Sequence, residues 1–362
     1  MTQRELYIDT FRGLMALVMV QGHVMDSLLT PATRAEPWYV FQLMFHGATA
    51  PGFLFASGYA SGLPRAPLSL RAILRRARRL VFVWGVGYFL HLPYFSFFKT
   101  AAAASAAERT ALFACDALQV IAATQLLVLG LQWVVGRHWT RVAAGVALLV
   151  IAVTPAVWSS GLAARLPEWL GPYLDASTGS PFPFFPFSAF VFGGTLAGAT
   201  LGRSEPARRF RLEIAWGLGI VGLGMILASA LAGRVDFWGP SPAYVFVRLG
   251  GLLVLLVVVE AAARAELPGV RAVALLGHET LLVYVLHLHL LFGGSFAPSV
   301  LDAWHGRLGF AGALAVLILM LPTLLAAAWA WRTTKQRRPQ QAQLALAFLT
   351  VTFLYEFAAR PW

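Results

Sequence analysis

The sequence has 362 residues, of which 59% are hydrophobic and only 12% charged, and its mean hydropathy is +0.70. A soluble domain carries about 25% charged residues, so this composition excludes an ordinary soluble protein and predicts an integral membrane protein. The net charge of +12 does not require nucleic acid, because basic residues collect in the loops on one side of a membrane protein. The single cysteine, Cys115, excludes an intrachain disulfide and argues against a thiolate metal site.

Apolar runs follow one another along the chain, most of them long enough to cross a bilayer as a helix. We therefore expect an all-α, polytopic transmembrane bundle of ten or eleven spans, forming a single domain over residues 1–362. The last run is short and could instead lie along the membrane interface. The predicted spans are residues 10–29, 41–62, 80–98, 114–135, 142–160, 184–202, 212–232, 243–263, 273–293, 309–331 and 342–358.

The basic residues predict the orientation of these spans. If the N-terminus is cytoplasmic, nineteen Lys and Arg residues fall in the inner loops and seven in the outer loops. Cytoplasmic loops carry the excess of Lys and Arg in membrane proteins. We therefore expect a cytoplasmic N-terminus and a multi-pass protein of a bacterial-type inner (plasma) membrane, surrounded by membrane lipid.

The first predicted span carries four ionisable residues, although such groups are costly in hydrocarbon. On a helix with about 100° per residue all four share one stripe, which must face protein or water. The simplest interpretation of the inner two is an ion pair or a cap, and the outer two are spaced so that a carboxylate can orient an imidazole. These residues are, from the inner end, Asp9, Arg12, His23 and Asp26.

Three further predicted spans carry a histidine at the depth of His23. At about 1.5 Å rise per residue, His46, His91 and His287 lie roughly 7–11 Å below the outer ends of their spans. A lone histidine is usually a satisfied core residue, but four at one level predict a shared polar cavity. Ser57 and Tyr284 fall on the same helix faces as the histidines. Pro51 should kink the second span.

The run RAILRRARR at residues 71–79 places several arginines along one helix face. Membrane topology alone explains most of such a run. Arg75 and Arg79 would also suit the phosphates of a donor that enters from the cytoplasm.

Several stretches together resemble membrane acyltransferases related to heparan-α-glucosaminide N-acetyltransferase, and equally acyltransferase family 3, which O-acetylates bacterial cell-surface glycans. Both groups open with an Asp-x-x-Arg-Gly signature, here Asp9, Arg12 and Gly13, and His23 matches a histidine implicated in catalysis in the glycan O-acetylases. The likeness is strongest over residues 5–291. The stretches are YIDTFRGLMALVMVQGH, HGATAPGFLFASGYASG, ALQVIAATQLL, FPFFPFSAFVFGGTLAG and LLGHETLLVYVLHLHLL.

The resemblance implies acetyl-CoA, or another acyl-CoA, as a cytoplasmic co-substrate, and a sugar or lipid-linked glycan as the outer acceptor. His23, oriented by Asp26, would be the general base, and His46 would assist or act as the base itself. Arg12, Arg75 and Arg79 would contact the co-substrate. No metal is expected.

Other function classes stay open at this point. The same polar residues could serve a proton-coupled transporter of a small molecule or lipid, although no internal repeat supports one. Paired histidines on facing helices could bind haem. The oligomeric state is open, with a homodimer among the alternatives.

Overall fold

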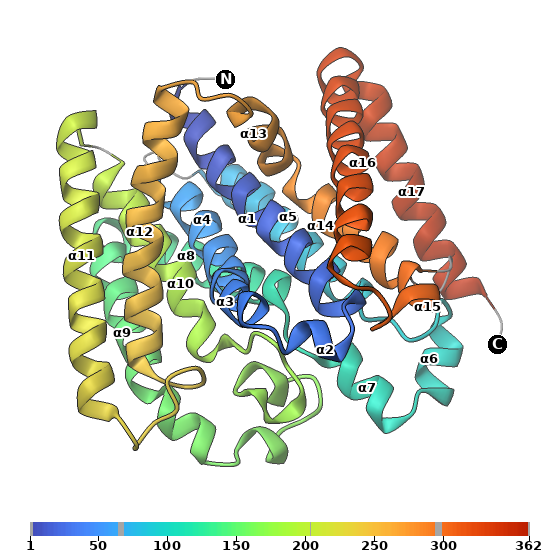
Figure 1. Cartoon of the computed structure of the whole chain (residues 1–362), viewed down its shortest axis with the longest axis horizontal. Helices are drawn as coiled ribbons and strands as arrows, with labels where there is room; N and C mark the ends of the chain where they lie inside the picture. The colour runs from blue at the N-terminus through green and yellow to red at the C-terminus, as the bar shows by residue number, and fades with distance from the viewer. Residues whose placement is uncertain (1–2, 64–68, 203, 294–298, 361–362) are drawn as a thin grey trace. The chain divides into compact units, whose positions relative to one another are not determined.

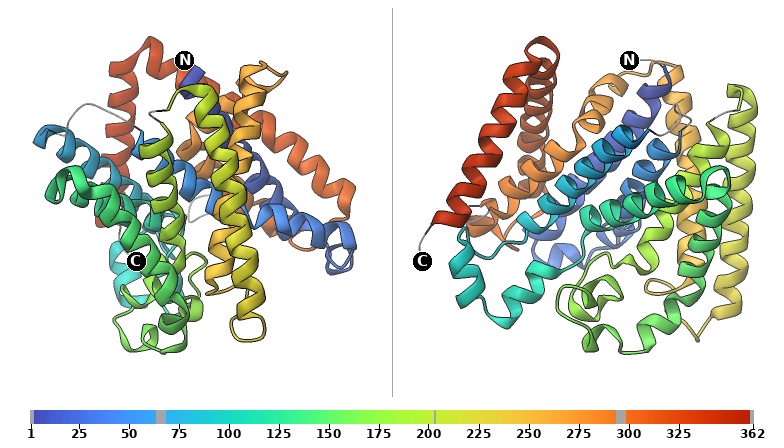
Figure 2. Two further views of the ribbon diagram at one scale, coloured as in Figure 1. Left: turned by 90° about the vertical axis from the view of Figure 1, so that its left-hand side faces the viewer. Right: turned by 180° about the vertical axis from the view of Figure 1, so that it is seen from behind.

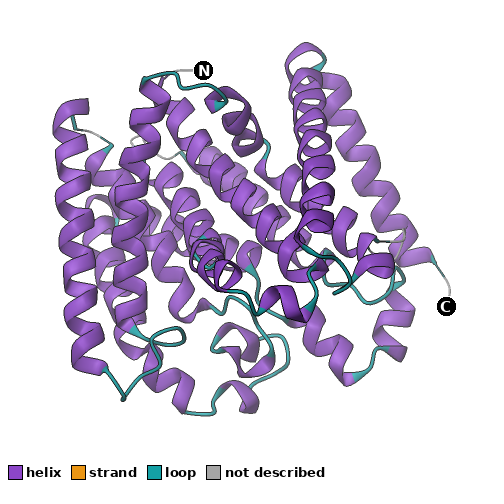
Figure 3. Cartoon of the chain, in the orientation of Figure 1, coloured by secondary structure: helices purple, strands orange, loops and turns teal. Residues whose placement is uncertain are grey.

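The computed structural model of the chain describes residues 3–63, 69–202, 204–293 and 299–360, most of which are helical (Figure 3). Over these ranges no β-strand forms, and one isolated bridge joins Leu29 to Leu308. The prediction of an all-α helical bundle is therefore confirmed.

The helices divide into two compact units, each described here by itself. The first consists of residues 1–49, 92–106 and 262–362, and the second of residues 50–91 and 107–261. Each unit combines segments that are far apart in the sequence.

The first unit is organised around helix α1, which contacts more helices of the unit than any other. This helix packs against α3, α13, α14, α15 and α16, and α16 in turn packs against α17 (Figures 1 and 2). The helices of this unit are α1 (Gln3–Leu28), α2 (Pro31–Arg34), α3 (Pro37–His46), α6 (Phe97–Ala103), α13 (Val270–His278), α14 (Thr280–Phe292), α15 (Val300–Trp304), α16 (Phe310–Arg337) and α17 (Pro339–Ala359).

Two glycines bring α1 and α13 into backbone contact. A Cβ at Gly13 would lie 1.8 Å from the carbonyl oxygen of Val273, and a Cβ at Gly277 would lie 1.8 Å from the carbonyl oxygen of Asp9. Small residues allow helices in membranes to approach this closely. Gly13 therefore serves the packing of α1 on α13.

The predicted ninth span is not one straight helix. Helices α13 and α14 meet at Glu279 with a bend of 85°. The bent segment contacts α1 on both sides of the break. It therefore supports α1 with two helices of different direction.

The second unit is a helical bundle in which α10 packs against α8 and α9, and α5 packs against α8. Helices α4 and α10 also touch through glycines, since a Cβ at Gly58 would lie 2.0 Å from the carbonyl oxygen of Val191. The helices are α4 (Thr49–Gly62), α5 (Leu70–Phe89), α7 (Ala106–Phe113), α8 (Ala117–Val134), α9 (Trp139–Ser159), α10 (Phe184–Leu201), α11 (Pro206–Leu231) and α12 (Pro242–Arg264), with short 3₁₀ turns η1 (Gly136–His138), η2 (Ala163–Arg165), η3 (Gly171–Tyr173) and η4 (Ala176–Thr178).

Within the described ranges, seven helices are long and apolar enough to cross a membrane, or eight if the bent pair α13–α14 counts as one span. They coincide with the last eight predicted spans, including the last, α17. The chain is thus a polytopic helical protein.

The first three predicted spans differ from the structure. The polar residues of α1 and the arginine run in α5 keep both helices out of the apolar class. The predicted second span is two helices, which separate at Gly47 and Ala48. Pro51 does not kink a helix, because it lies in the first turn of α4, where its missing N–H is not needed.

Candidate active site

Two imidazoles from α1 and α14 form the centre of the candidate site. His23 Nδ1 lies 3.0 Å from His287 Nε2, and the two rings stack with centroids 5.2 Å apart. His23 is partly exposed, whereas His287 is fully buried. The sequence places these residues 264 positions apart, and the packing of α14 on α1 brings them together.

His287 is held by its own helix. Its Nδ1 lies 3.0 Å from the carbonyl oxygen of Val283, one turn earlier on α14. The ring of Tyr284 lies with its centroid 5.7 Å from that of His287. On the other side of the pair, Phe292 meets His23 edge-on at 5.9 Å. Buried and aromatic surroundings therefore fix both rings.

A second group of hydrogen-bonded side chains is centred on Asp26 of α1. His46 Nδ1 lies 3.0 Å from Asp26 Oδ2, and Tyr39 donates its hydroxyl to Asp26 Oδ1 over 2.7 Å. Arg34 donates to the backbone carbonyl of Asp26 at 3.2 Å. The carboxylate thus orients His46, the last residue of α3.

The His23–His287 pair and the Asp26 group come together at the rings of His23 and His46. Their centroids are 5.6 Å apart and the rings are nearly perpendicular. A carboxylate three residues after His23 was expected to orient that ring, but Asp26 is hydrogen-bonded to His46 and Tyr39, and His23 is hydrogen-bonded to His287. The i,i+3 spacing predicts only that the two side chains are close enough to interact. The side chains of the neighbouring helices determine which hydrogen bonds form.

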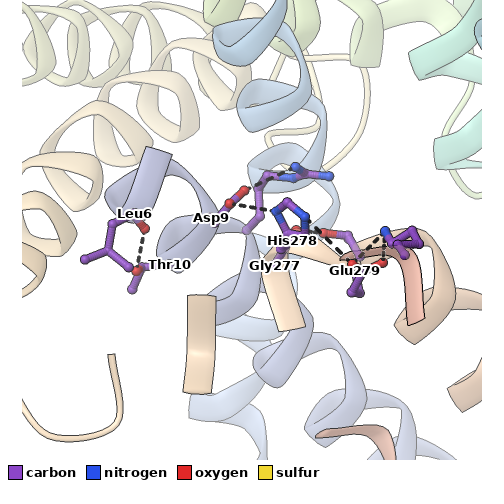
Figure 4. Close-up of polar contacts among 9 residues, drawn as sticks. Leu6, Asp9, Thr10, Gly277, His278 and Glu279 are labelled. Atoms are coloured by element: carbon purple, nitrogen blue, oxygen red, sulfur yellow. Dashed lines mark hydrogen bonds and ion pairs between the residues drawn. The ribbon is translucent and has the colours of Figure 1, made fainter. Parts of the chain in front are cut away.

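A third polar cluster surrounds the N-terminal part of α1 (Figure 4). Arg12 pairs with Asp9 at 3.5 Å, as the sequence predicted, and His278 Nδ1 approaches the other oxygen of Asp9 at 3.2 Å. His278 Nε2 lies 3.8 Å from the buried Glu279, which Lys335 of α16 contacts at 2.7 Å. This cluster joins α1 to the break between α13 and α14, and to α16.

Comparison with known families decides the classification. Residues 5–332 match the acyltransferase domain that defines acyltransferase family 3. The chain belongs to acyltransferase family 3. No curated protein matches it significantly.

Within this family member, the Asp-x-x-Arg-Gly signature has a visible structural role. Asp9 and Arg12 form the inner ion pair, and Gly13 makes room for Val273 of α13. His23, eleven residues after Arg12, lies in the imidazole cluster. The signature therefore fixes α1 against α13, and the C-terminal half of α1 carries His23 and Asp26.

The remaining predicted site residues lie in the second unit, where His91 and Ser57 have polar partners. His91 is in the turn after α5 rather than inside a span, because α5 ends at Phe89, and its Nε2 lies 3.9 Å from Asp116. Ser57 accepts a hydrogen bond from Gln125. Arg75 and Arg79 are exposed on α5.

The structure also contains a buried charged cluster that the sequence interpretation missed. Arg209 contacts Glu260 of α12 and lies 3.9 Å from Glu213, and Tyr59 of α4 donates to Glu213 at 3.1 Å. The i,i+4 spacing of Arg209 and Glu213 at the start of an apolar run was the available signal. No sequence signal links Tyr39 to Asp26, since they lie on different helices.

A metal site does not emerge from these clusters. Among residues 3–63, 69–202, 204–293 and 299–360, no group of three or more His, Cys, Asp or Glu side chains is arranged to hold a metal ion.

Proposed function

We propose that this family member transfers an acetyl or other acyl group from cytoplasmic acyl-CoA to a hydroxyl or amine of a sugar or lipid-linked glycan at the outer face of a bacterial-type inner membrane. The observation that carries the proposal is the pair of imidazoles from α1 and α14, with His23 3.0 Å from His287. A partly exposed imidazole beside a buried partner suits proton transfer near neutral pH.

The reaction can be written with its proton and leaving group accounted for. The acceptor O–H or N–H gives its proton to His23 while the acceptor atom forms a bond to the acyl carbon. The C–S bond of the thioester then breaks, and the sulfur leaves as a thiolate that takes up the proton from His23, which returns the imidazole to its neutral form. General base catalysis of this kind contributes about 10²–10⁴-fold to the rate.

His46 is proposed to act beside His23 as a donor. Its Nδ1 faces the Asp26 carboxylate, which holds the ring in place, and a proton on its other ring nitrogen would stabilise negative charge on the thioester oxygen. Arg12, which pairs with Asp9, is proposed to attract the donor phosphates, and the same role is proposed separately for Arg75 and Arg79 on α5.

Purified protein in liposomes tests the proposal. Radiolabelled acetyl-CoA is supplied on one side and a panel of glycan acceptors on the other, and acylated product is measured. His23→Ala and His46→Ala should each reduce transfer strongly. If both retain full turnover, the mechanism is wrong.

The same preparation distinguishes the transporter alternative. Accumulation of a solute or lipid that depends on a proton gradient, without acylated product, would favour transport. Release of free CoA that depends on acceptor, without a gradient, would favour acyl transfer.

A further inference from the structure

We propose that His287 is a positioning residue that selects the tautomer of His23, and so makes Nε2 of His23 the basic nitrogen. This inference rests on the proposed function for its kinetic consequence. Its structural part, the position of the protons, stands on the described hydrogen bonds alone.

The series of hydrogen bonds begins at the backbone of α14. The carbonyl oxygen of Val283 can only accept, and it lies 3.0 Å from His287 Nδ1. Nδ1 of His287 must therefore carry the proton. In a neutral imidazole the other nitrogen then has the lone pair, so Nε2 of His287 is an acceptor.

The hydrogen bond between His287 and His23 comes next. His23 Nδ1 lies 3.0 Å from this acceptor, so it must donate. A proton on Nδ1 of neutral His23 leaves the lone pair on Nε2. The chain of bonds from Val283 through His287 to His23 thus assigns one basic atom at its end.

Burial makes the assignment firm. His287 has no exposed surface, so a buried ring with both nitrogens bonded has little freedom to flip or to exchange partners with water. Because His287 uses both nitrogens in this chain, it is not itself the base. The partly exposed His23 takes that role.

The same hydrogen bonds also give His23 and His46 different roles. His46 Nδ1 faces the Asp26 carboxylate. His23 Nδ1 faces the acceptor nitrogen of His287, so a neutral His23 presents its lone pair on Nε2. The two rings, with centroids 5.6 Å apart, therefore have different partners and different roles.

A pair of substitutions tests the role of His287. In His287→Gln the amide N–H can still donate to Val283 and the amide oxygen can still accept from His23, so activity should stay within about tenfold of wild type. His287→Met keeps comparable bulk but cannot accept well, and kcat should fall by on the order of 10²–10⁴, the usual contribution of a positioned general base. KM for the donor should change little.

His289 provides matched controls on the same helix. Its Nδ1 also lies close to the carbonyl one turn earlier, 2.9 Å from Val285. His289→Gln and His289→Met should both retain turnover. Equal activity of His287→Gln and His287→Met, whether both high or both low, would overturn the inference.

A spectroscopic measurement needs no variant of His287. In wild-type protein labelled with ¹⁵N-histidine, the His23 signals, assigned by their loss in His23→Gln, should show a protonated Nδ1 and an unprotonated Nε2. The opposite pattern overturns the inference even if His23 proves to be catalytic. Conversely, full activity of His23→Ala would overturn the proposed function and leave the proton assignment standing.

Discussion

Gly22 of α1 lies against the imidazole of His46, so closely that a Cβ at this position would be 2.1 Å from His46 Cδ2. The position of the ring beside Asp26 and His23 therefore depends on a missing side chain. No other residue type can stand at position 22 without moving His46.

Gly22→Ala should consequently reduce acyl transfer at least tenfold, because His46 must leave Asp26 or α3 must shift. Overpacking of this kind also costs about 1–3 kcal/mol of stability. Turnover and the unfolding temperature in detergent measure the two effects. Gly130→Ala on α8 is the control, since its added Cβ meets nothing within 4 Å, and it should be neutral or slightly stabilising.

Tyr39→Phe removes the hydroxyl that donates to Asp26 at 2.7 Å. A hydrogen bond to a charged group contributes about 1.5–3 kcal/mol, and water can replace part of it because Asp26 is about a third exposed. We expect a several-fold loss of kcat with a small loss of stability. Tyr355→Phe on the exposed face of α17 should change neither. Unchanged kcat in Tyr39→Phe would show that Asp26 does not need this donor to orient His46.

Gly277→Ala should destabilise the first unit more than a typical glycine substitution. The added Cβ would lie 1.8 Å from the backbone carbonyl of Asp9, and backbone cannot rotate away as a side chain can. The unfolding temperature should fall by several degrees or more. Gly222→Ala on α11 has open space and should not lower it. A normal unfolding temperature in Gly277→Ala would contradict the close packing of α1 on α13.

Lys335→Met removes the cation that contacts the buried Glu279. A buried carboxylate without its partner is destabilising, and the half-exposed lysine limits the loss to about 1–3 kcal/mol. The double variant Lys335→Met/Glu279→Gln should recover much of that loss, because no buried charge remains. Thermal unfolding of both variants checks this order. A double variant that is less stable than Lys335→Met would show that Glu279 is held mainly by other groups.

The sequence predicted the helical class and most spans correctly, because apolar runs such as those of α9 and α16 leave little alternative in length or composition. It failed where polarity interrupts a span. The break after His46 comes at Gly47 and Ala48, within an otherwise apolar sequence. The bend at Glu279 lies where the chain contacts α1 and α16, and no local sequence signal marks these contacts.

The candidate site shows the same division. The stripe on α1 and the presence of His46 and His287 were readable from helix geometry and depth. Their pairing was not, because hydrogen bonds between α1, α3 and α14 depend on how these helices pack. The positions of Tyr39 and His278 in these clusters depend on helix packing and could not be predicted from the sequence.

The unbroken course of α1 has a consequence for the size of the donor. Arg12 and His23 are eleven residues apart on one helix, which at about 1.5 Å per residue separates them by roughly 16 Å. If the donor phosphates bind near Arg12, the acyl carbon must lie about that far from them in order to reach His23. A thioester on a long flexible arm can do so, and a small acyl phosphate cannot. The fixed separation of Arg12 and His23 on the helix would thus select donors by their length.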